Sequence, residues 1–172
     1  MNSSNPNGHR AGLPGLLPET PARGLKAASP GLHGSSDALA LAALAREQLL
    51  KSSPSLASHP IAVVCAEPFD ALRLKEEIAW FAPDLRVAVF PDWETLPYDH
   101  FSPHQDLVSD RLATLHAASR GAFDLLLVPA TTMLGRLPPP SYLAGFTFFL
   151  KKGERLDIQA MRDQMTLAGY SH

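Results

Sequence analysis

The sequence is poor in several features that would point to particular classes of protein. It has one cysteine in 172 residues, which excludes a disulfide framework. It has no run of about 18 apolar residues, so no segment has the length of a membrane-spanning helix. The amino terminus lacks the charged-then-apolar pattern of a secretory signal. These absences favour a cytoplasmic protein that is not attached to a membrane.

An excess of charge of one sign is missing as well. The 15 Lys and Arg residues face 17 Asp and Glu residues, which leaves a formal net charge of −2. A broad nucleic-acid-binding surface needs a basic stripe, so any phosphate contact would have to be local. Apolar residues make up 45% of the chain, enough to form a core. The length suits one ordinary domain and part of a second.

Three short apolar segments alternate with amphipathic ones. The apolar segments are predicted to be strands at 61–66, 86–90 and 124–130, and the others helices at 37–51, 68–82 and about 106–120. Solid apolar strands separated by amphipathic helices predict an α/β fold, with a parallel sheet covered by helices on both faces. Cys65 lies within the first strand, where we expect it to be buried and reduced.

The two ends of the chain differ from this central unit, 37–137. Residues 1–36 are rich in Gly, Pro, Ser and Asn without a sustained hydrophobic period, which predicts a disordered leader. Three successive prolines forbid regular structure and indicate a boundary near 137–141. A strand at 145–150 and a helix from Asp157 to about Ala168 then predict the beginning of a small α+β second domain, 138–172. Because that strand has no predicted partner, we expect the chain alone to be marginally stable and prone to aggregate.

A parallel α/β sheet raises the question of a nucleotide site, which would lie where the chain enters its first helix. The segment GLHGSSDA there can be aligned with the phosphate-binding pattern GxxxxGK[ST]. Gly31 fits, but Ser36 replaces the second glycine, Asp37 the lysine and Ala38 the magnesium-binding hydroxyl. A carboxylate at the lysine position would repel nucleotide phosphates, whereas Asp37 suits the start of a helix. We therefore favour helix capping over phosphate binding and expect no cofactor in this chain.

No other arrangement of catalytic or metal-binding residues is apparent. His100 and His104 flank a proline on a predicted loop and lack the spacing of a zinc site. Nucleophile motifs such as GxSxG or CxxC are absent. The sequence therefore predicts neither a catalytic residue nor a metal ligand.

The segment FPDWETLPYDHFSPHQD connects the second predicted strand to the third predicted helix, and its prolines indicate a rigid connection. Its aromatic residues could pack over the ends of the strands or contact another domain; these are Trp93, Tyr98 and Phe101. Further along, Lys151 and Lys152 precede Gly153 in a predicted basic turn, which is either solvated or a contact site.

Several strings resemble the N-terminal region of the bacterial transcription-repair coupling factors. WETLPYD and SPHQD occur at fixed spacing and are followed by DRLATL and DLLLVPATTMLGRLPPP. AEPFDALRLKEEIAWF and FLKKGERLDIQAMRDQMTLAGYSH extend the resemblance over residues 37–172. These strings are long and unusual in composition, so the resemblance is specific.

The resemblance implies a RecA-like domain similar to the damage-recognition protein UvrB, incomplete here and without a working nucleotide site. A small domain that binds UvrA would follow it. The function implied is a non-catalytic adaptor that links stalled RNA polymerase to nucleotide excision repair. The family's motor, which uses ATP and magnesium and moves on duplex DNA, would lie beyond residue 172, as would its polymerase-binding module. The alternative is that the chain is itself the ATP-binding part of a translocase.

Two departures from the family limit what the resemblance implies. UvrB has a long aromatic hairpin that threads damaged DNA, and the connection at 90–106 is too short to form one. The UvrA-contacting arginines of the family cluster around and after a final GY-x-H, where Ser171 occupies the matching position.

Overall fold

The computed structural model describes residues 24–28, 31–51, 60–93, 95, 100, 102–146, 152–153 and 155–167. The elements in chain order are α1 (Ser36–Lys51), β1 (Ile61–Cys65), α2 (Pro68–Phe81), β2 (Val87–Val89), α3 (Gln105–Ser119), β3 (Leu125–Pro129), α4 (Ala130–Met133), α5 (Pro140–Phe146) and α6 (Ile158–Leu167).

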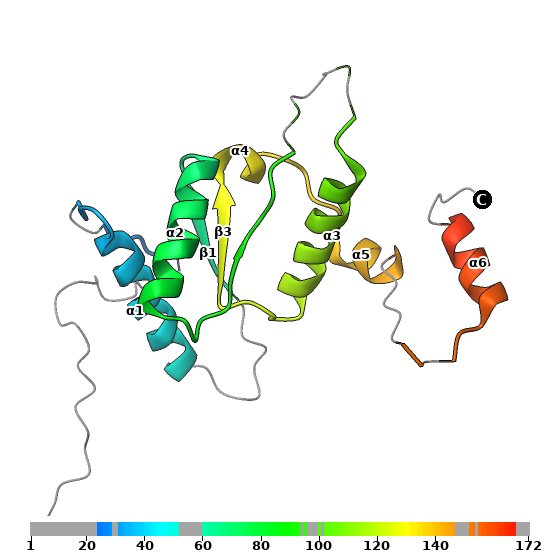
Figure 1. Cartoon of the computed structure of the whole chain (residues 1–172), viewed down its shortest axis with the longest axis horizontal. Helices are drawn as coiled ribbons and strands as arrows, with labels where there is room; N and C mark the ends of the chain where they lie inside the picture. Colours follow the sequence, from blue (N-terminus) through cyan, green and yellow to red (C-terminus); the bar gives the residue numbers. More distant parts are fainter. Residues whose placement is uncertain are drawn as a thin grey trace, which may run out of the picture.

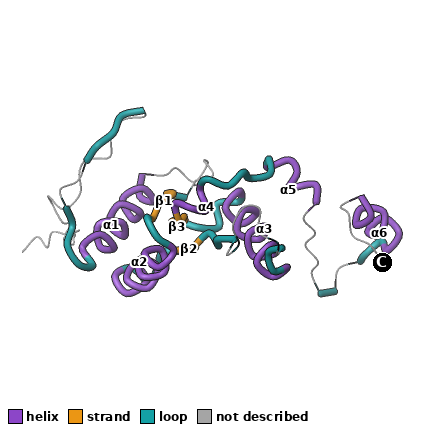
Figure 2. The backbone as a smooth tube through the Cα atoms, turned by 90° about the horizontal axis from the view of Figure 1, so that it is seen from above, coloured by secondary structure: helices purple, strands orange, loops and turns teal. Residues whose placement is uncertain are grey.

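The strands form a three-stranded parallel sheet in the order β1-β3-β2. Leu125 at the start of the central strand is opposite Ile61 on one side and Val87 on the other. Helices α1 and α2 lie on one side of the sheet, and α3 and α4 lie on the other (Figures 1 and 2). The predicted α/β class and parallel sheet flanked by helices are confirmed.

The core lies between β3 and the pair α1 and α2. Alternate residues of β3 are buried, and Leu125 and Leu127 are fully inaccessible. Ile78 of α2 is also fully buried, and α1 presents the small residues Ala38, Ala42 and Ala45. Small side chains let two helices pack closely, and each large buried side chain contributes about 2 kcal/mol relative to an exposed one. The buried residues of α2, which are Ala71, Leu74 and Ile78, lie on one face of the helix.

Helix α3 begins one residue earlier than predicted. Asp106 was expected to open it, but His104 is the N-cap, and its Nδ1 accepts the backbone N–H of Asp106 at 3.3 Å. At the other end, Gly121 has a φ of 65°, a conformation that costs glycine little and ends a helix.

The region after β3 is more helical than predicted. The three prolines do not exclude regular structure, because α5 begins at Pro140, and a proline at the first helical position loses no hydrogen bond. Gly145 and Phe146 belong to α5, so the predicted strand is wrong at these positions, and residues 147–150 lie outside the described part. Helix α5 packs against α3, and Leu143 is buried. The domain boundary near 137 stays a prediction.

The two ends of the chain are described only in part. Most of the predicted leader, residues 1–23 and 29–30, lies outside the described residues. Helix α6 matches the helix predicted from Asp157, and no residue in it is buried.

Asp124 joins the amino ends of β2 and β3. Its side chain is only 4% exposed, and its carboxylate accepts the backbone N–H of Arg86 at 2.8 Å and the guanidinium of the same residue at 2.6 Å. The Arg86 guanidinium lowers the pKa of Asp124 below its usual range.

We predict that Asp124→Asn lowers the free energy of unfolding by about 1–3 kcal/mol, the usual contribution of hydrogen bonds to a charged group. The amide keeps the size of the side chain but loses the charge. Urea titration at pH 7 measures the effect. Asp84→Asn is the matched control: Asp84 pairs with Arg46 at an exposed site, and this variant should unfold like the unchanged chain.

The effect of Asp124→Asn on the free energy of unfolding should depend on pH. Because the folded state lowers the pKa of Asp124, its contribution is complete above the unfolded value of about 3.9 and is lost as the pH falls through the folded value. The difference in stability between the unchanged chain and Asp124→Asn should therefore shrink below about pH 4. A difference that stays constant down to pH 3 would contradict this assignment.

Candidate functional site at the carboxyl edge of the sheet

The carboxyl ends of the parallel strands meet at one edge of the sheet, where ligand sites of α/β proteins usually lie. Cys65 and Pro129 are register partners at the ends of β1 and β3, and α2 and α4 begin just after these strands. The carboxyl end of β3 points toward α4 in Figure 1. Two clusters of side chains lie near this edge, one at the start of α1 and one after β2.

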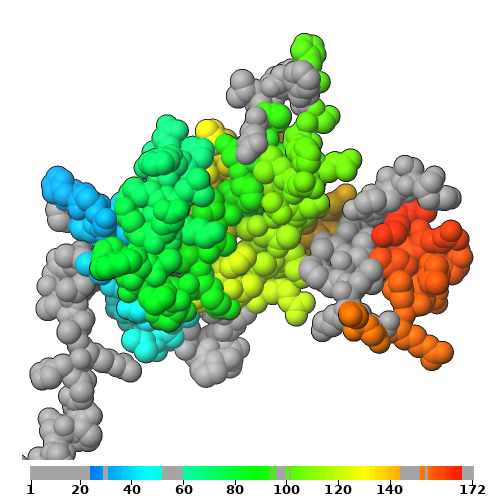
Figure 3. All heavy atoms as spheres, viewed as in Figure 1, coloured from blue at the N-terminus to red at the C-terminus, as the bar shows by residue number. Residues whose placement is uncertain are grey.

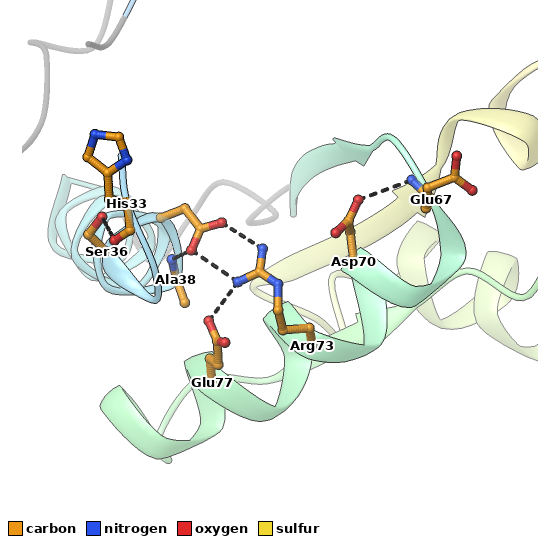
Figure 4. Close-up of polar contacts among 8 residues, drawn as sticks. His33, Ser36, Ala38, Glu67, Asp70, Arg73 and Glu77 are labelled. Carbon is orange, nitrogen blue, oxygen red and sulfur yellow. Dashed lines mark hydrogen bonds and ion pairs between the residues drawn. The ribbon is translucent and has the colours of Figure 1, made fainter. Parts of the chain in front are cut away.

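The first cluster contains the segment aligned with a phosphate-binding loop. Gly31 is exposed, and Gly34 has a φ of 58° in the turn before α1. Ser36 is the first residue of α1, and its hydroxyl donates to the carbonyl of His33 at 2.7 Å (Figure 4). Ala38 is fully buried. The segment is thus the first turn of α1 and the turn before it.

Asp37 is bound by an arginine from α2. One carboxylate oxygen lies 2.8 Å from Nη2 of Arg73, and the other lies 3.3 Å from Nη1. Arg73 also pairs with Glu77, one turn further along α2, at 2.8 Å (Figure 4). The hydrogen bond from Arg73 lowers the pKa of Asp37, and burial opposes this effect. Where a phosphate-binding loop carries a lysine, this chain therefore has a carboxylate that is already paired.

The Asp37 carboxylate also contacts the helix backbone. It accepts the N–H of Ala38 at 2.7 Å, so it supplies a negative charge to the positive end of the α1 dipole. A nucleotide phosphate would compete with this internal anion for the same helix end.

The second cluster surrounds Arg111 of α3, which is 3% exposed. Its guanidinium carbon lies 4.4 Å from the centre of the Phe90 ring and 4.0 Å from that of Trp93. The guanidinium also donates to the carbonyl of Pro91. Burial lowers the pKa of Arg111, and the nearby Asp92 carboxylate partly offsets this effect. The cluster holds the first residues of the connection that follows β2.

Asp92 continues this cluster toward α4. It accepts the N–H of Trp93 at 2.8 Å and the hydroxyl of Thr131, in α4, at 2.8 Å. Burial alone would raise the pKa of Asp92, but these hydrogen bonds outweigh it and lower the pKa. Asp92 therefore joins two segments that are far apart in the sequence.

The residues predicted to form a contact surface are only partly described. Trp93 is half-buried over Arg111, at the end of the sheet. Lys152 lies in an exposed turn with Gly153, whose φ is 90°. Tyr98, Phe101 and Lys151 lie outside the described residues.

Sequence reasoning missed two arginines. Nothing local marks Arg73 as the partner of Asp37, because the two are 36 positions apart. Arg111 did leave a signal: it falls on the same face of α3 as Val108, Leu112 and Leu115. A charged residue inside an apolar stripe indicates a buried, specifically bound side chain.

The remaining candidates give no reactive site. Cys65 is 4% exposed, as expected, and burial raises the pKa of its thiol, which disfavours the nucleophilic thiolate. Among the described residues, no group of three His, Cys, Asp or Glu side chains could hold a metal ion. No described helix is both long and apolar enough to cross a membrane.

Helix α2 also exposes three large apolar side chains on its outer face, where Glu76 lies among them. Phe69 is 75% exposed, Leu72 54% and Trp80 79%. These three follow the spacing of one helical stripe, opposite the buried stripe of the same helix. In the space-filling view α2 forms much of the visible surface over the sheet (Figure 3).

Comparison with known proteins shows homology to transcription-repair-coupling factors. The Escherichia coli protein is 44% identical over 113 residues, covering 66% of this chain and 10% of that protein. The Haemophilus influenzae protein is 43% identical over 108 residues, covering 63% of this chain and 9% of that protein. The Mycobacterium tuberculosis protein is 32% identical over 126 residues, covering 65% of this chain and 10% of that protein. No protein-family model matches the chain.

The homology is limited in extent. The chain spans about a tenth of the length of the curated relatives it matches. The homology to transcription-repair-coupling factors that the sequence strings indicated is confirmed, and its place in the N-terminal region of those proteins stays a prediction.

The ion pair between Asp37 and Arg73 should couple α1 to α2. We predict a coupling energy of about 0.5–1.5 kcal/mol in a double-mutant cycle of Asp37→Asn and Arg73→Gln, because the pair is bidentate but partly exposed. Urea unfolding of the four proteins measures it. A cycle that replaces Arg73→Gln with Lys75→Gln is the control, since Lys75 is an exposed residue of the same helix. Equal coupling in the two cycles would contradict the assignment.

Proposed function

We propose that this chain is a UvrB-like, non-catalytic adaptor portion of a transcription-repair coupling factor. The observation that carries the proposal is the 44% identity over 113 residues to the Escherichia coli protein of that name. In such a protein the adaptor would recruit UvrA to the place where RNA polymerase has stalled. ATP, magnesium and duplex DNA would be bound by other parts of the protein, which the adaptor would contact.

The geometry of the α1 start supports a role without nucleotide chemistry. A phosphate-binding loop needs backbone N–H groups and a lysine free to meet the phosphates. Here Asp37 occupies the lysine position and is bound by Arg73, and Glu77 adds a second carboxylate beside that guanidinium. A nucleotide triphosphate would meet two carboxylates before it met an unpaired cation.

The surface supports a role in contacts. Large apolar side chains that gather on one exposed face are typical of interaction surfaces. The outer face of α2 has this character, with Trp80 79% exposed.

Nucleotide binding tests the non-catalytic part of the proposal. We expect a fluorescent ATP analogue with magnesium to show no saturable binding up to about 1 mM, the upper end of usual Michaelis constants. An active P-loop ATPase titrated under the same conditions is the positive control. Saturable, magnesium-dependent binding would instead favour the alternative that the chain is the ATP-binding part of a translocase.

UvrA binding tests the adaptor part. We expect Ser171→Arg to bind immobilised UvrA about tenfold more tightly than the unchanged chain, because it adds a charge-assisted contact at the position where the family has contacting arginines. Ser141→Arg adds the same charge at an exposed site in α5 and should leave binding unchanged. The absence of UvrA binding by all three proteins, at concentrations where they are folded, would count against recruitment by this chain.

A further inference from the structure

The contacts around Arg111 join three elements that are separate in the sequence. Arg111 lies in the middle of α3, the residues after β2 pass beneath it, and α4 begins where β3 ends. The segment Phe90–Trp93 lies between the other two, with contacts on each side.

On the side of α3, the contacts are made by the guanidinium group. Its carbon lies over two aromatic rings, at 4.4 Å from the centre of Phe90 and 4.0 Å from that of Trp93, and it donates to the carbonyl of Pro91. Cation–π attraction strengthens when the cation is removed from water, and this guanidinium is buried. A flat guanidinium can stack on two rings and donate at its edge at the same time, which a lysine ammonium cannot do.

On the side of α4, the contacts are made by Asp92 and Trp93. Asp92 accepts the Thr131 hydroxyl at 2.8 Å, while its other oxygen accepts the Trp93 N–H at the same distance. The indole Nε1 of Trp93 lies near Gly135: a Cβ on Gly135 would be in ordinary contact with that nitrogen, at 3.9 Å, and tight against the carbonyl of Thr132, at 3.3 Å. The turn after α4 is therefore fitted against the same tryptophan that Arg111 holds.

We propose that Arg111 is a positioning residue: it makes the segment Phe90–Trp93 and residues 130–135 one conformational unit. Residues 130–135 comprise α4 and the turn that follows it, and are called the turn 130–135 below. The guanidinium fixes Phe90 and Trp93, and these fix Asp92 where it holds Thr131. Arg111 makes no hydrogen bond or ring contact to the turn itself among the described residues. The contacts of Arg111 that lead toward the turn run through Phe90, Pro91 and Trp93.

Amide hydrogen exchange on the complete chain tests this coupling between Arg111 and the turn 130–135. We expect Arg111→Met to increase exchange in the turn 130–135 on the order of tenfold, the scale of coupling through side-chain networks. Exchange in β1 and in the buried part of α2 should not change. Arg120→Met, at the exposed end of the same helix, is the matched control and should leave the turn unaffected.

Three further substitutions, one at Arg111 and two that provide backgrounds for it, keep the test decisive. Arg111→Lys retains the charge but cannot stack on both rings, so it should increase exchange in the turn as well, even if the methionine variant does not fold. In a Thr131→Val background, where the link to Asp92 is already broken, Arg111→Lys should add little to exchange in the turn. In a Trp80→Phe background, where Trp93 is the remaining tryptophan, acrylamide should quench its fluorescence several-fold more strongly after Arg111→Lys.

The outcomes separate coupling between Arg111 and the turn from packing of Arg111 against its neighbours alone. Faster exchange in the turn that depends on Thr131 supports the coupling. If Trp93 becomes more accessible while exchange in the turn stays the same, Arg111 packs only against its neighbours and the proposal is wrong. An equal increase in exchange across β1, α2 and the turn would also overturn it, because that pattern shows general destabilisation.

Discussion

Strand β3 pairs with β1 on one side and with β2 on the other, and the described structure is arranged around this central strand. Parallel strands cannot be joined by tight turns, so each connection must cross from one end of the sheet to the other. Helices α2 and α3 make these crossings, and each begins near the carboxyl edge. The burial of Leu125 and Leu127 fixes which face of β3 meets α1 and α2. The position of both candidate clusters follows from this pairing, because it places the ends of all three strands at one edge.

Three ion pairs of the described residues join segments that are distant in the sequence. Asp124 binds Arg86 at the amino edge of the sheet, and Asp37 binds Arg73 between two helices. Arg46 and Asp84 connect the end of α1 to the turn after α2. Such pairs contribute modestly when exposed, but the buried Asp124 carboxylate would be costly without its partner. These three pairs therefore hold together parts of the fold that the sequence keeps apart.

The sequence was a good guide to elements that carry a regular hydrophobic pattern. The strands at 61–65 and 125–129 and the buried stripe of α2 follow from short apolar runs and from the spacing of Ala71, Leu74 and Ile78. The predicted start of α3 was one residue late because His104 is an uncommon N-cap. Helix α5 was not predicted because proline disrupts the interior of a helix, whereas here Pro140 is the first residue of one. Comparison with the phosphate-binding pattern shows Asp37 at the position of the lysine. The sequence does not reveal its arginine partner, because pairing over 36 positions depends on how two helices pack.

The carboxyl edge of the sheet is held together by contacts within the chain. In an α/β protein that binds nucleotides, the helix end and the strand ends at this edge meet the ligand. Here the Asp37 carboxylate occupies the α1 helix end and is paired with Arg73, while Arg111 is enclosed by Phe90 and Trp93. Both arginines thus bind groups of the chain itself and help hold α1 and the segment after β2 against the rest of the unit. Arg73 and Arg111, the two arginines of the candidate clusters, are thus engaged in internal contacts. The same contacts join α1 to α2 and the segment after β2 to α3 and α4, so this edge is held by side chains from four helices.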